Sequence, residues 1–117
     1  MDANEYQILS RRTRRMDLRL IERINNAVLG IAGEAGEIVE AHKKMLYHGH
    51  DMDGEQVRDE LGDLFFYAAW LADEYGWTLE EIMQSNVNKL RRRFPDGFST
   101  EASIARVDVS TKAQGGL

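Results

Sequence analysis

The stretch EAGEI at residues 34–38 is followed along the chain by a second stretch of the same pattern, ELGDL at residues 60–64. Each contains an acidic residue, a small or apolar residue, a glycine, a second acidic residue and a large aliphatic residue. On an α-helix, residues three apart lie on one face, one turn from each other. We therefore expect two helices that together carry a group of four carboxylates.

The sequence around the two acidic stretches predicts an all-α fold. Apolar residues recur at helical spacing from about Leu18 to Tyr47 and from about Gly54 to Tyr75, without an interrupting proline. A further helix is expected to begin at the capping box formed by residues 78–81 and to end near Phe94, because Pro95 disfavours helical geometry in the residue before it.

The two ends of the chain carry weaker patterns. Residues 2–15 are expected to form a helix with a thin apolar stripe and a run of arginines. Such a run is interpreted either as a solvated face or as a patch that meets phosphate or an acidic partner. Residues 1–98 are expected to form one helical domain, and residues 99–117 a polar, partly disordered C-terminal arm.

Three glycines, Gly30, Gly33 and Gly36, lie inside the first long helical pattern. Each costs a helix about 1 kcal/mol relative to alanine. Close approach of another helix is the expected reason, and a kink near Gly30 is the alternative. Gly36 and Gly62 lie between the paired acids, where the missing side chains are expected to let the helices approach.

Length, charge and composition limit the classes of function. The chain has 117 residues, which suits one domain, and a net charge of −5 gives no general attraction to nucleic acid. It contains no cysteine, so it has no disulfide framework and no thiolate site. Its longest apolar run, residues 64–72, is far shorter than the ~20 residues needed to cross a bilayer, and its N-terminus lacks the apolar region of a signal peptide. We expect a cytoplasmic protein that does not act at a membrane.

The four acids have the chemistry of a metal site. A helical wheel places Glu34 and Glu60 on the apolar faces of their helices, with Glu37 and Asp63 beside them. Acids in such positions are costly unless they are paired or bound to a cation. Four carboxylates without a soft ligand favour Mg²⁺, with Mn²⁺ as the second choice, and a pair of solvated acidic faces is the alternative. No Glu-x-x-His motif of the di-iron type is present.

Cationic, amide and aromatic residues near this group are candidates to bind the phosphates or the base of a substrate. Two lysines follow the first acidic stretch by two turns, a tyrosine follows the second by one turn, and three residues recur at helical spacing on the third predicted helix. The alternatives are solvated helix ends for the polar residues and core packing for the tyrosine. The candidates are Lys43, Lys44, Tyr67, Asn86, Lys89 and Arg93.

The chain resembles the MazG-like nucleotide pyrophosphohydrolases, a family of the all-α NTP pyrophosphatase superfamily. The resemblance is carried by LGIAGEAGE at residues 29–37, DELGDL at residues 59–64, NVNKL at residues 86–90 and RFPDGF at residues 93–98. The family's E-x-x-E…E-x-x-D signature is complete, and its residues here are Glu34, Glu37, Glu60 and Asp63.

This resemblance implies a helical bundle completed by homo-oligomerisation, as a dimer or a tetramer built as a dimer of dimers. It implies Mg²⁺-dependent hydrolysis of a nucleoside triphosphate between its α- and β-phosphates, which removes non-canonical or surplus nucleotides and in which the four acids are the metal-binding and catalytic residues. A phosphoribosyl-ATP pyrophosphohydrolase, a dimeric dUTPase and a helical oligomer that binds nucleotide without turnover are the alternatives.

Overall fold

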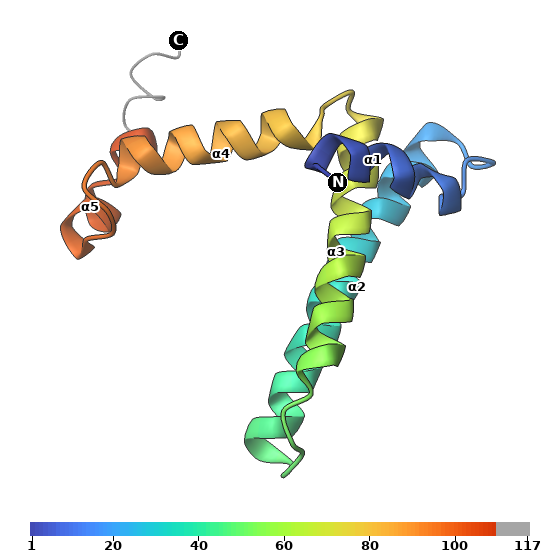
Figure 1. Cartoon of the computed structure of the whole chain (residues 1–117), viewed down its shortest axis with the longest axis horizontal. Coiled ribbons are helices and arrows are strands. Elements are labelled where there is room, and N and C mark those ends of the chain that lie inside the picture. The colour runs from blue at the N-terminus through green and yellow to red at the C-terminus, as the bar shows by residue number, and fades with distance from the viewer. Residues whose placement is uncertain (110–117) are drawn as a thin grey trace. The chain divides into compact units, whose positions relative to one another are not determined.

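The computed structural model describes residues 1–109, and over these residues the protein is all-α, with no strand (Figure 1). The predicted fold class is therefore confirmed. The helices are α1 (Ala3–Ser10), the 3-10 helix η1 (Arg11–Thr13), α2 (Leu20–Tyr47), α3 (Gly54–Glu74), α4 (Leu79–Arg93) and α5 (Thr100–Ala105).

The predicted bounds of the long helices agree with the structure to within about two residues. Local chemistry explains the ends: Asp53 accepts a hydrogen bond from the backbone N–H of Gln56 at the start of α3, and Gly49 has a φ of +73° just after α2. The prediction of one helix over residues 2–15 is wrong, because α1 ends at Ser10 and Arg14 is extended.

The described chain divides into two compact units, the first comprising residues 1–79 and the second beginning at Glu80. The first unit contains α1, η1, α2 and α3, and the second contains most of α4 together with α5. The expected boundary between a domain at 1–98 and an arm at 99–117 stays a prediction, and its last residues, 110–117, lie outside the described part. No helix within residues 1–109 has the length and apolar character that crossing a membrane requires.

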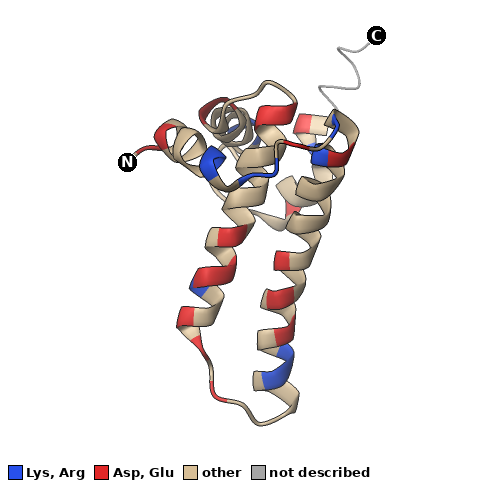
Figure 2. Cartoon of the chain, turned by 90° about the vertical axis from the view of Figure 1, so that its right-hand side faces the viewer, with Lys and Arg blue, Asp and Glu red and all other residues tan. Residues whose placement is uncertain are grey.

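Helices α2 and α3 lie side by side and form the body of the first unit (Figures 1 and 2). Ala27 of α2 and Trp70 of α3 are buried, and the Tyr67 ring of α3 lies against Gly30 of α2. Near the junction with α1, Arg23 of α2 donates from Nε to Glu74 of α3 at 2.9 Å, and the indole N–H of Trp70 donates to the same carboxylate oxygen at 3.1 Å. The pair is therefore joined by apolar packing and by a largely buried charge.

Close approach explains only one of the helical glycines. A Cβ added to Gly30 would lie 2.2 Å from Cδ1 of Tyr67, so the Tyr67 ring occupies the space that a side chain would need. The expectation of close approach is confirmed at Gly30. It is wrong for this chain at Gly33, Gly36 and Gly62, where an added Cβ meets nothing within 4 Å.

Replacing Gly30 with alanine is expected to lower the free energy of unfolding by about 1 kcal/mol or more, because overpacking outweighs the helix preference of alanine. Replacing Gly33 with alanine is expected to raise the free energy of unfolding by about 0.5–1 kcal/mol, because its surroundings are open. Urea unfolding of both variants at one protein concentration measures the difference. Shifts of the same sign and size would contradict the close packing at Gly30.

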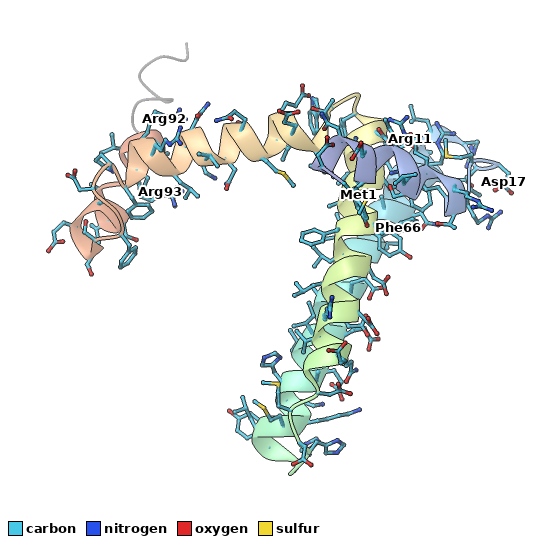
Figure 3. The ribbon with its side chains drawn as sticks, in the orientation of Figure 1. Met1, Arg11, Asp17, Phe66, Arg92 and Arg93 are labelled. Atoms are coloured by element: carbon cyan, nitrogen blue, oxygen red, sulfur yellow. The ribbon has the colours of Figure 1, made fainter. Side chains whose placement is uncertain are left out.

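Helix α1 is anchored to the end of α3 by a partly buried polar network around Asp73. Arg11 donates from Nε and Nη2 to the Asp73 carboxylate, both at 2.9 Å, and Arg14 donates from Nη1 to the same group (Figure 3 labels Arg11). Gln7 donates from Nε2 to Asp73 at 2.9 Å, and Arg15 pairs with Asp17. Arg11 and Arg14 therefore stabilise the fold. The sequence interpretations of the arginine run, a solvated face or a binding patch, did not include this role.

Candidate active site

Three of the four predicted acids come together between α2 and α3. One carboxylate oxygen from each of Glu34, Glu60 and Asp63 lies within 4.8 Å of the other two. Figure 2 shows acidic residues, in red, along both helices of the pair. The helical spacing of Glu60 and Asp63 on α3 and the apolar pairing of α2 with α3 produce this grouping, because facing apolar sides bring the acids on those sides together.

The electrostatics of the group show mutual repulsion among its charges. A hydrogen bond with Glu60, partial burial, and the charges of Asp63, Glu60 and Glu37 raise the pKa of Glu34 from 4.5 to about 7. Two carboxyl groups that share a hydrogen bond need one proton between them. A cation of charge +2 would replace that proton and offset two of the three negative charges of the group.

The three residues fit a hard divalent cation. They offer only carboxylate oxygens, which are the ligands that Mg²⁺ and Mn²⁺ prefer. Hydrogen bonding to Glu60, partial burial and the neighbouring acids raise the pKa of Glu34, so the group concentrates negative charge. Glu37 is exposed and lies outside the three-residue group, although its charge acts on Glu34. Its direct binding to the same ion stays a prediction.

The two lysines that follow the first acidic stretch are paired with a neighbouring acid. Nζ of Lys43 lies 3.0 Å from the Glu40 carboxylate, and Nζ of Lys44 lies 3.8 Å from it. Hydrogen bonding to Lys43 is the main cause that holds the pKa of Glu40 below its usual value. Lys44 also lines a polar cavity with His50, next to the loop that connects α2 to α3. Neither lysine forms an ion pair with the three grouped acids.

Tyr67 is packed within the α2–α3 pair. Its ring contacts Gly30, stacks on the Trp70 ring with centroids 6.2 Å apart, and meets the Phe66 ring edge-on at 5.1 Å. These contacts correspond to the packing alternative for this residue. A contact of its hydroxyl with substrate stays a prediction.

The three candidates on α4 belong to the second unit, so their relation to the acids of the first unit stays a prediction. Asn86 and Lys89 are exposed. Arg93 is half-buried and donates from Nε and Nη2 to the two carboxylate oxygens of Asp108, at 2.7 and 2.9 Å. Asp108 is only 5% exposed, so this bidentate pair occupies the edge of Arg93 that would otherwise bind phosphate.

Sequence reasoning missed one residue next to the acidic group. Tyr6, on α1, places its hydroxyl 3.4 Å from the carbonyl oxygen of Gly62, the residue before Asp63. In the sequence, Tyr6 belongs only to the thin apolar stripe of the first helix. No local pattern relates it to a site 56 residues away, because that contact depends on how α1 docks on α3.

Comparisons with known proteins agree with the arrangement of the acids. Residues 23–98 match a family model described as the MazG nucleotide pyrophosphohydrolase domain. The chain is also 37% identical over 84 residues to the Gene 37 protein of Mycobacterium phage L5, an alignment that covers 66% of this chain and 71% of that protein. No solved structure is significantly similar to the chain. The family match spans well over half of the sequence and includes every acid of the candidate site, so the chain belongs to the MazG nucleotide pyrophosphohydrolase domain family.

Proposed function

We propose that the protein hydrolyses nucleoside triphosphates between the α- and β-phosphates, with Mg²⁺ as cofactor, and releases the nucleoside monophosphate and pyrophosphate. The observation that carries the proposal is the grouping of Glu34, Glu60 and Asp63 within a domain of this family. Control of the nucleotide pool in the cytoplasm is the proposed role.

The chain's own residues have distinct parts in this proposal. Glu34, Glu60 and Asp63 hold the metal ion. When bound, the ion supplies positive charge to the phosphate oxygens and lowers the pKa of water. Glu37 is exposed beside the group, and its carboxylate orients the attacking water and accepts its proton.

The residues proposed to bind phosphate differ in the ion pairs that they would have to break to do so. Lys89 is exposed and carries no ion pair among those formed by the described residues. To bind phosphate, Lys43 and Lys44 would each have to leave Glu40, and surface ion pairs of this kind cost little to break. A phosphate contact by Arg93 requires exchange with the buried carboxylate of Asp108, so we assign the pyrophosphate first to the lysines.

We also propose that the protein is a homo-oligomer, either a dimer or a dimer of dimers. Large apolar side chains on α2 and α3 are left open to solvent, including Leu29, which is 70% exposed, and Phe65, which is 55% exposed. Apolar surface of this kind is covered in stable assemblies. Light scattering at micromolar concentration is expected to give at least twice the chain mass of 13.4 kDa, and a monomer would contradict this.

A substrate panel in isotopically labelled water tests the reaction. The protein is incubated with Mg²⁺ and each canonical and several modified (d)NTPs, including dUTP, in H₂¹⁸O, and the products are identified by mass spectrometry. The proposal predicts pyrophosphate and a monophosphate, with ¹⁸O in the monophosphate if water attacks the α-phosphorus. Diphosphate with inorganic phosphate would overturn the proposal, and binding without turnover would favour the non-catalytic alternative.

Metal binding is expected to depend on pH through Glu34. The proton on this residue must leave before the ion binds, so the apparent affinity for Mn²⁺ is expected to rise about tenfold between pH 6 and pH 8 for a pKa of about 7. Calorimetry in two buffers of different ionisation enthalpy counts the released proton. An affinity independent of pH over this range would contradict the shared proton.

The raised pKa of Glu34 also determines how the stability of the folded protein changes with pH. The folded-state pKa of Glu34 lies above its usual 4.5, so the stability that its protonated form contributes is present below pH 4.5 and is lost as the pH rises through about 7. Metal should therefore raise the Tm of the protein more at pH 8 than at pH 5.5. Thermal unfolding with and without Mn²⁺ at both pH values measures this.

A further inference from the structure

Tyr6 brings a hydroxyl group from α1 to the middle of α3. The hydroxyl donates to the carbonyl oxygen of Gly62 across 3.4 Å. That carbonyl belongs to the peptide group whose nitrogen is the backbone nitrogen of Asp63. Tyr6 lies outside residues 23–98, the part of the chain that matches the family model, so this contact comes from a segment that the family match does not cover.

The segment that carries Tyr6 is firmly held on α3. The Tyr6 ring packs against the buried cluster that contains Ala69 and Ala72. The next residue, Gln7, is buried and forms hydrogen bonds of 2.8–2.9 Å with the carboxylate of Asp73 and with backbone groups of residues 77 and 79. A side chain fixed in this way can restrain the backbone it contacts.

The hydroxyl of Tyr6 is a suitable hydrogen-bond donor for the carbonyl oxygen of Gly62. In an α-helix the carbonyl of Gly62 accepts the N–H four residues later with one lone pair, and its second lone pair remains for the hydroxyl of Tyr6. Burial raises the pKa of Tyr6, and the charge of Asp63 raises it further. The phenol therefore keeps its proton at neutral pH and remains a hydrogen-bond donor.

We infer that Tyr6 is a positioning residue for the acidic group: its hydroxyl restrains the peptide between Gly62 and Asp63 and thereby the place of the Asp63 carboxylate. The inference rests on the proposed function, because Asp63 has to bind the ion for its position to matter. On this account α1 is part of the support of the metal site, in addition to its role in the fold.

The test compares Tyr6→Phe with Tyr75→Phe in the full chain. Both variants lose one phenol hydroxyl, but Tyr75 lies at the far end of α3, where its ring stacks on Trp77. Mn²⁺ affinity is measured by calorimetry at a temperature at which circular dichroism shows both variants to be fully folded. The electron paramagnetic resonance line shape of the bound Mn²⁺ reports on the arrangement of its ligands.

Tyr6→Phe is expected to bind Mn²⁺ about tenfold more weakly and with a changed line shape, in the range of other groups that orient metal ligands. Tyr75→Phe is expected to match the wild type in both respects. Wild-type affinity in Tyr6→Phe, whatever its Tm, would overturn the inference and leave Tyr6 a packing residue, and so would an equal loss in Tyr75→Phe. Failure of the wild type itself to bind Mn²⁺ would instead count against the proposed function.

Discussion

Replacing Glu60 with glutamine is expected to lower the rate of Mg²⁺-dependent pyrophosphate release by about 10²–10³-fold, because it removes a charge that holds the metal ion and, with it, charge stabilisation of the transition state. Glutamine keeps the size of the side chain and one oxygen, so the fold should persist. Glu34→Gln is expected to have an effect of the same size, since Glu34 and Glu60 share one hydrogen bond in the grouped acids.

A matched control separates the site from a general loss of negative charge. Glu55, also on α3, is exposed, and its ion pair within the described part of the chain is a long surface pair with Arg58, at 3.9 Å. Glu55→Gln should therefore retain wild-type activity. Pyrophosphate release measured at saturating nucleotide and a series of Mg²⁺ concentrations would decide: near-native rates in both Glu34→Gln and Glu60→Gln would remove these acids from the reaction.

The largest expected effect on stability comes from Asp73→Ala, which should lower the free energy of unfolding by about 3 kcal/mol, because removal of one partner leaves a buried charge uncompensated. The uncompensated charge is Arg14, whose side chain is only 2% exposed and whose Nε has no hydrogen-bond partner within residues 1–109. In a chain of this size such a loss lowers the Tm by about 10 °C or more.

The control for this variant is Asp17→Ala. Asp17 pairs with Arg15 at 2.7 Å, but both side chains are largely exposed, so the variant should lose far less stability than Asp73→Ala. Thermal and urea unfolding of both variants at one protein concentration makes the comparison. If Asp73→Ala loses as little as Asp17→Ala, the network around Asp73 does not hold α1 in place.

The pH dependence of the unfolding free energy of the wild type tests the network around Asp73 in a second way. Burial raises the pKa of Asp73, but hydrogen bonds from Arg11 and Arg14, with the charges of both arginines, outweigh this and bring the pKa below its usual 3.8. The stability contributed by the charged form is present above pH 3.8 and is lost as the pH falls through the lower folded-state value. Asp73→Ala should therefore lose less stability in acid than the wild type does.

The sequence was sufficient for the three long helices, α2, α3 and α4, and for the grouping of three acids. Apolar residues at helical spacing predict the faces of α2 and α3, and the first acid of each stretch falls on those faces. Glu34 and Glu60 are half-buried in the structure, as that placement requires. Two helices joined by a short loop pack through their apolar faces, so residues on those faces meet.

Contacts that depend on how α1, α2 and α3 pack against one another could not be predicted from the sequence. Gly30 and Gly33 look alike in the sequence, but only Gly30 lies where the Tyr67 ring crosses α2, and periodicity does not show the point of crossing. The charge of Arg14 gave no sign of its partner 59 residues away. The hydroxyl of Tyr6 reaches α3 for the same reason, since the docking of α1 decides which residues it contacts.

The most direct test of the acidic group is the position of the metal ion itself. Crystals of the protein grown with Mn²⁺ and a non-hydrolysable nucleotide analogue are measured at a wavelength at which manganese scatters anomalously. We expect an anomalous peak in direct contact with carboxylate oxygens of Glu34, Glu60 and Asp63. A peak at another place, with these three carboxylates separated and facing solvent, would contradict this expectation.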